Sequence, residues 1–138
     1  MLAEAKLTPE LRNEALYFRA KAYLNQQADK KAMNDLQALA KDTRTLYGAE
    51  AKYLVALQLY KAHEYAAAEK EILNFIEQST PHAYWLARSF VLLSDVYHAT
   101  GKDLDARQYL LSLQQNYQGN DDIESMIESR LQKLKTEN

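Results

Sequence analysis

The chain has 138 residues, a formal net charge of −2 at pH 7 and no cysteine. This length suits one domain with a core, and the charge is unlike the clustered lysine and arginine typical of nucleic-acid-binding proteins. The lack of cysteine excludes disulfides, thiolate metal sites and cysteine nucleophiles. With only 3 glycines and 2 prolines, the chain offers few tight turns, so we predict an all-α fold of long helices.

Start signals and breaks divide the chain into seven predicted helices. The Thr-Pro pairs at 8–9 and 80–81 each predict a hydroxyl N-cap with proline at the first helical position. Asp121, with Glu124 three residues later, predicts a capping box. The predicted helices span about residues 9–26, 29–41, 45–61, 65–79, 81–100, 103–117 and 121–135.

Comparison of the chain with itself shows an internal repeat. We call Tyr23, Leu59 and Tyr97 the anchor residues; they are 36 and 38 residues apart. Nine residues after each anchor stands an alanine, and at two further positions large apolar residues recur: Ala32, Ala68, Ala106; Leu36, Ile72, Leu110; Leu39, Phe75, Leu113. Small residues precede the anchors at two positions: Ala20, Ala56, Ser94; Ala15, Ala51, Ser89. Three helix pairs are therefore predicted, over about residues 9–44, 45–80 and 81–118.

The small side chains would let the two helices of each pair approach closely. A single pair cannot cover its own apolar face, so we expect the pairs to stack into a solenoid closed by a cap. The last predicted helix suits that role because its apolar residues form one stripe. The stripe consists of Ile123, Met126, Ile127, Leu131 and Leu134.

At these positions the chain resembles the tetratricopeptide repeat family. That family has a small residue at the eighth position of each repeat, a large one at the eleventh, alanine at the twentieth and a large apolar residue at the twenty-fourth. The matching sets are Ala20, Tyr23, Ala32, Leu36; Ala56, Leu59, Ala68, Ile72; and Ser94, Tyr97, Ala106, Leu110. The present repeats are longer than the family's 34 residues, and the family's early tryptophan is missing.

The resemblance implies a right-handed α–α superhelix of three helix pairs plus a capping helix. It also implies a non-catalytic scaffold, without cofactor, that binds a peptide or helix of a partner protein in its concave groove. The longer repeats and the segment 84–90 are similar to bacterial envelope members of the family, namely the Tol–Pal-associated coordinator and outer-membrane assembly lipoproteins. This similarity implies a periplasmic or outer-membrane-associated location.

In the family, the groove is lined by the first helix of each pair. By register, the candidate partner-binding residues are Glu14, Tyr17, Lys21, Asn25, Glu50, Tyr53, Leu57, Tyr60, Arg88, Val91, Asp95 and His98. Tyr17 and Tyr53 occupy equivalent positions, so we expect them to stack as neighbours. Tyrosine suits recognition because it offers contact area and a polar tip at low entropic cost.

Other functions find less support in the sequence. Asp95 and His98 share a helix face, but no third ligand follows at a spacing suited to zinc, so we predict no metal site. No nucleophile elbow or phosphate-binding glycine loop is present, so we predict no enzyme. No apolar run approaches the ~20 residues of a membrane span.

Three alternatives to peptide binding stay open. The chain begins without signal-peptide features, as if inside a helix, so we expect it to be part of a longer protein. It would then be a structural spacer in that protein, or the accessory domain of a separate catalytic partner. Self-association through an edge containing Leu2 and Leu7 is the third alternative.

Overall fold

The computed structural model describes residues 8–136, which form seven α-helices and no strand. This confirms the all-α prediction. The helices are α1 (Pro9–Asn25), α2 (Asp29–Leu39), α3 (Leu46–Lys61), α4 (Tyr65–Glu77), α5 (Ala83–Ala99), α6 (Asp103–Asn116) and α7 (Ile123–Thr136). The predicted Leu2 and Leu7 edge lies outside the described residues.

The N-cap of α1 forms as predicted, but that of α5 does not. The Thr8 hydroxyl accepts a hydrogen bond from the Leu11 amide at 3.1 Å, and Pro9 is the first helical residue. The predicted cap at Thr80 is wrong because α5 begins at Ala83. The Thr80 hydroxyl instead donates to the backbone carbonyl of Thr43 at 2.6 Å. This hydroxyl therefore joins the α4–α5 connection to the α2–α3 connection.

The predicted capping box before α7 is also wrong. Asp121 accepts a hydrogen bond from the amide of Ile123, only two residues later, at 3.0 Å. The helix begins at Ile123 itself, which makes Glu124 its second residue. The Asp121 side chain therefore closes a turn ahead of the helix, and Glu124 has no reciprocal role there.

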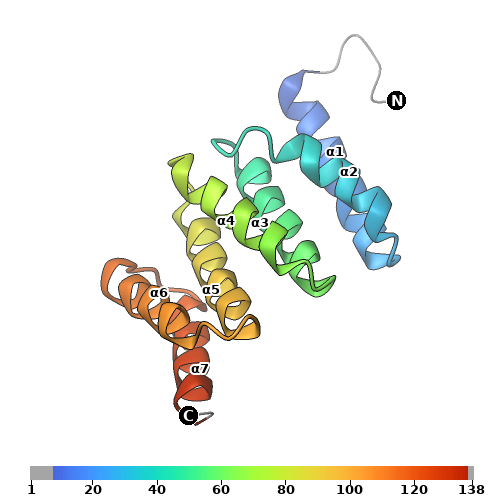
Figure 1. Ribbon diagram of the computed structural model, residues 1–138. Coiled ribbons are helices and arrows are strands. Elements are labelled where there is room, and N and C mark those ends of the chain that lie inside the picture. The colour runs from blue at the N-terminus through green and yellow to red at the C-terminus, as the bar shows by residue number, and fades with distance from the viewer. Residues whose placement is uncertain (1–7, 137–138) are drawn as a thin grey trace.

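The helices pack in a regular order along the chain. Each helix contacts the next one, and α1, α3, α5 and α7 also contact one another in succession. The pairs follow one another across the molecule, with α1 and α2 at one end and α7 at the other (Figure 1). Successive odd-numbered helices are therefore neighbours although a complete helix separates them in the sequence.

The first helix of each pair ends in the same turn. The amide five residues after each anchor residue donates to the anchor carbonyl, as in a Schellman motif. The three bonds are Ala28 N to Tyr23 O (2.8 Å), Glu64 N to Leu59 O (2.9 Å) and Lys102 N to Tyr97 O (2.7 Å). The residue before each donor is left-handed, with φ of 60° at Gln27, 63° at His63 and 80° at Gly101. The repeat seen in the sequence is thus present in the backbone.

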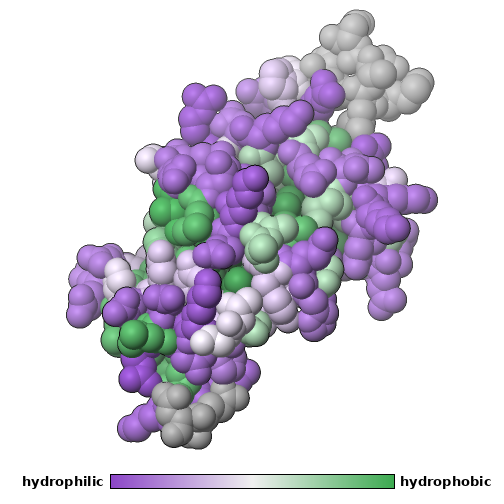
Figure 2. Space-filling model, in the orientation of Figure 1, coloured by the Kyte–Doolittle hydropathy of each residue, from purple (hydrophilic) through white to green (hydrophobic). Residues whose placement is uncertain are grey.

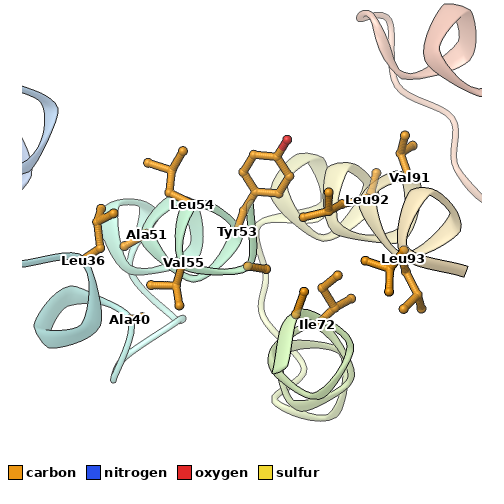
Figure 3. Close-up of a cluster of buried hydrophobic side chains, with 14 of the residues drawn as sticks. Leu36, Ala40, Ala51, Tyr53, Leu54, Val55, Ile72, Val91, Leu92 and Leu93 are labelled. Carbon is orange, nitrogen blue, oxygen red and sulfur yellow. The ribbon is translucent and has the colours of Figure 1, made fainter. Parts of the chain in front are cut away.

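The core lies between the two helices of each pair. The three register alanines Ala32, Ala68 and Ala106 have no exposed surface, and Leu36, Ile72 and Leu110 are at most 1% exposed. Figure 3 shows Val55, Leu93 and Ile72 on one side of α3 and α5, whereas Tyr53 and Val91 project to the opposite side. The odd-numbered helices therefore have one face toward their partners and another face outside the pair.

The predicted stripe of α7 is also buried. Ile123, Ile127 and Leu134 are at most 3% exposed, and α7 packs on α5 and α6. The face in Figure 2 is mostly hydrophilic, with its apolar residues in small, separated patches. Within residues 8–136, no helix is long and apolar enough to cross a membrane.

The shared turn leads to a stability prediction. Substitution Gly101→Ala should lower the free energy of unfolding by about 1 kcal/mol, because a left-handed conformation disfavours a side chain. An added Cβ would meet nothing within 4 Å, so a steric clash does not contribute. Urea denaturation followed by circular dichroism measures the change.

Gln27→Gly is the matched variant at the equivalent turn. It should shift stability in the opposite direction, by a smaller amount, because glycine also loses more chain entropy on folding. Equal stability of Gly101→Ala and the wild-type protein would contradict the assignment of strain to this turn.

Candidate functional site

A hollow of about 560 Å³ lies where α3, α5 and α7 meet, on the face that these helices turn away from their partners. We call it the α3–α5–α7 hollow. It is lined by Tyr53, Leu57, Tyr60, Arg88, Val91, Leu92, Asp95, Met126, Ser129, Arg130 and Lys133. Aromatic, aliphatic and charged side chains thus meet in one concave surface, a composition typical of peptide-binding sites.

Half of the twelve candidate residues line this hollow. They are Tyr53, Leu57, Tyr60, Arg88, Val91 and Asp95, all from α3 and α5. Helical spacing of three or four residues places them on one face of each helix. The structure therefore brings together the second and third sets of candidates, and their role in binding stays a prediction.

Sequence reasoning missed the third wall of the hollow, which α7 supplies. Its residues Met126, Ser129, Arg130 and Lys133 also follow helical spacing. They flank the buried stripe of Ile123, Ile127 and Leu134, which by itself indicates only a cap. Their spacing beside that stripe was the available signal, because a helix that caps α5 necessarily turns its flank toward the same groove.

Arg88 lies in an aromatic environment at one side of the hollow. Its Nη1 donates to the Tyr84 hydroxyl at 3.1 Å, and its Nη2 donates to the Tyr53 hydroxyl at 3.3 Å. The guanidinium lies 5.0 Å from the ring centre of Tyr53 and 5.8 Å from that of Trp85. Both acceptors are neutral hydroxyls, so dipoles and aromatic faces balance the Arg88 charge within the described part of the chain.

Asp95 and Arg130 join α5 to α7 across the hollow. Nε and Nη2 of Arg130 each donate to one Asp95 carboxylate oxygen, both at 3.2 Å. Tyr60 lies beside this pair; its burial raises the pKa of its hydroxyl, and the negative charge of Asp95 raises it further. Tyr60 therefore stays a neutral hydroxyl at physiological pH.

Tyr17, Lys21 and Glu50 form a separate network between α1 and α3. The Tyr17 hydroxyl donates to Glu50 at 3.1 Å, and the Lys21 ammonium contacts the same carboxylate at 3.1 Å. Burial raises the pKa of Tyr17, and the negative charge of Glu50 raises it further. Within residues 8–136 these three candidates bind one another and do not line the α3–α5–α7 hollow.

The expected stacking of Tyr17 on Tyr53 is wrong for the described residues. Tyr17 stacks on Tyr47, with ring centres 4.4 Å apart, and Tyr53 packs against Trp85 at 5.7 Å. Each tyrosine is therefore covered by an aromatic residue at the start of the next odd-numbered helix. The reason is geometric, because residues 47 and 85 occupy equivalent positions two turns or less before the register residue of their own helix.

The remaining candidates lie outside the hollow. Glu14 and Asn25 are exposed on α1. His98 shares a smaller neighbouring hollow with Tyr60 and Asp95, and its Nδ1 lies 2.8 Å from the Asp103 carboxylate. Among residues 8–136, no three potential metal ligands of the His, Cys, Asp or Glu type come together.

The Glu50 network yields a second prediction. Glu50→Gln should lower the free energy of unfolding by about 1–2 kcal/mol, because Tyr17 and Lys21 lose a charged acceptor while Lys21 keeps partial access to water. Glu14→Gln is the matched control, since Glu14 is exposed at the equivalent position of α1. Thermal unfolding of both variants tests this, and equal losses would show that the network does not stabilise the α1–α3 contact.

Comparison with known proteins adds no assignment: no protein-family model, curated protein or solved structure matches the chain. A functional assignment therefore depends on the geometry of the described residues.

Proposed function

We propose that this chain is a non-catalytic protein–protein interaction scaffold of the tetratricopeptide type. In this proposal its three helix pairs form a right-handed superhelix, α7 is the capping helix, and a peptide or helix of a partner binds in the α3–α5–α7 hollow. The order of helix contacts and the three equivalent turns support this architecture. The bacterial envelope location is part of the proposal only through family resemblance.

One observation supports the binding function above the others. The hollow combines apolar surface from Leu57, Val91 and Met126 with hydrogen-bonding groups such as Tyr60 and Arg88. A segment that only spaces two other parts of a protein has no need of such a surface. Partner segments bind to mixed surfaces of this kind through aromatic and arginine side chains.

Self-association has its own supporting observation at the opposite end. Leu11 and Phe18 of α1 are 51% and 60% exposed, and they lie two helical turns apart on one face. If this face joins two copies, sedimentation will show a mass that rises with protein concentration, and Phe18→Ser will abolish the rise. A constant mass over the whole concentration range would contradict self-association.

The hollow can be tested by filling it. Ser129 lies on its α7 wall and is exposed, so Ser129→Trp should block the hollow without disturbing the core. Gln132→Trp adds the same side chain at an exposed position of α7 outside the hollow. Each immobilised protein is incubated with extract of the source organism, and retained proteins are quantified by mass spectrometry.

We expect a partner retained by the wild-type protein and by Gln132→Trp to be reduced at least about tenfold by Ser129→Trp, because steric exclusion removes the central contacts. Circular dichroism must show equal helix content in the three proteins. Identical retention by all three would contradict binding in the hollow and would favour the spacer alternative.

A further inference from the structure

The charges of the α3–α5–α7 hollow specify the kind of segment that fits it. We infer that the hollow accepts an acidic side chain, Asp or Glu, of a partner protein, and that Arg88 is its principal contact. This inference rests on the proposed function and adds the chemical class of the partner to it.

The hollow has a local excess of positive charge. Its cationic residues are Arg88, Arg130 and Lys133, whereas Asp95 is the single carboxylate among its described lining residues. That carboxylate is already hydrogen-bonded to Arg130. The whole chain has a formal net charge of −2, so this concentration of positive charge is opposite to the average of the molecule. Complementary charge across an interface favours a negatively charged partner.

Arg88 is the least satisfied of these groups. Its Nε is buried and has no hydrogen-bond partner among residues 8–136. Its terminal nitrogens donate to the hydroxyls of Tyr53 and Tyr84, and the Tyr84 hydroxyl in turn donates to Asp122 at 2.9 Å. Arg88 thus reaches a carboxylate only through a tyrosine in the described part of the chain. A partly desolvated cation with an unused donor gains more from an incoming carboxylate than an exposed one does.

The equivalent position in the preceding odd-numbered helix supplies an internal comparison. Glu50 of α3 and Arg88 of α5 are 38 residues apart, the same interval as the anchors Leu59 and Tyr97. Glu50 is neutralised within the protein by Lys21 and Tyr17. Arg88 has no such counterpart among the described residues. The missing partner is therefore specific to this hollow and does not follow from the repeat itself.

The surroundings of Arg88 favour a protein segment over a free anion. The hollow extends well beyond the guanidinium, and Leu57, Val91 and Met126 add apolar surface to it. A small anion would leave this surface exposed to water. A peptide covers it, and the resulting loss of water strengthens the ion pair with Arg88.

Selection from a random peptide library tests the inference directly. Dodecamers displayed on phage are fused to the coat protein through their C-terminus, so every carboxylate they offer is a side chain. The library is selected against the wild-type protein, Arg88→Gln and Arg12→Gln. Arg12 is exposed on α1 and lies outside the hollow, so its variant is a control for the lost charge.

We expect Asp and Glu to be enriched in peptides selected by the wild-type protein and by Arg12→Gln, but not by Arg88→Gln. Replacing the selected acidic residue by Asn or Gln should weaken binding about tenfold or more, as measured by fluorescence anisotropy at fixed salt. Inorganic phosphate alone, at equal ionic strength, serves as the free-anion arm.

Each other outcome has a distinct meaning. Peptides selected without acidic enrichment, and lost on Ser129→Trp, would overturn the acidic partner while the proposed function stands. Failure to select any peptide would overturn both. Phosphate binding without acidic enrichment would reassign Arg88 to a free anion and overturn the inference.

A direct measurement at Arg88 covers the case in which Arg88→Gln fails to fold. The Nε–H group of each arginine gives its own signal in a nitrogen–proton correlation spectrum of the wild-type protein. Addition of a selected acidic peptide should shift the Arg88 signal, and the Gln-substituted peptide should not. An unchanged Arg88 signal under saturating acidic peptide would overturn the contact.

Discussion

Close approach of the two helices in each pair is the constraint on which the rest of the structure depends. At the crossing, Ala20, Ala56 and Ser94 of the first helices are at most 2% exposed, and Ala32, Ala68 and Ala106 of the second have no exposed surface. A larger side chain at any of these positions would separate the helices and leave a cavity beside the neighbouring leucine or isoleucine. The same spacing sets where the outer faces of α3 and α5 lie, and hence how the hollow between them and α7 is shaped.

The two halves of the groove use similar residues in different ways. Between α1 and α3, Tyr17, Lys21 and Glu50 satisfy one another, so this part is a structural contact. Between α5 and α7, Asp95 and Arg130 are joined in that manner, but Arg88 stays with neutral partners among the described residues. A repeated backbone thus accommodates a structural network in one interval and an open surface in the next, because the side-chain charge at one register position differs in sign.

Much of the fold could be predicted from the sequence because its signals are local and repeated. Alanine spacing located the helix pairs, and the anchor residues proved to be those whose carbonyls accept the closing turn bonds. The errors arose where contacts join distant segments. Thr80 bonds to Thr43, so its hydroxyl was not free to cap α5. For the site, helical register located the walls from α3 and α5, but pairing of Glu50 with Lys21 depends on how α1 leans on α3, and no spacing rule contains that information.

The position of α7 gives the hollow a property of its own. This helix packs on α5 and α6, and no later described helix covers its other side. Terminal helices open locally at a lower free energy than internal ones. Since Arg130 of α7 is held to Asp95 at the edge of the hollow, an occupant that contacts both α5 and α7 would hold this last helix in place. Occupancy would then be recorded in the slow hydrogen exchange of α7 backbone amides, far along the chain from the α3 residues that share the site.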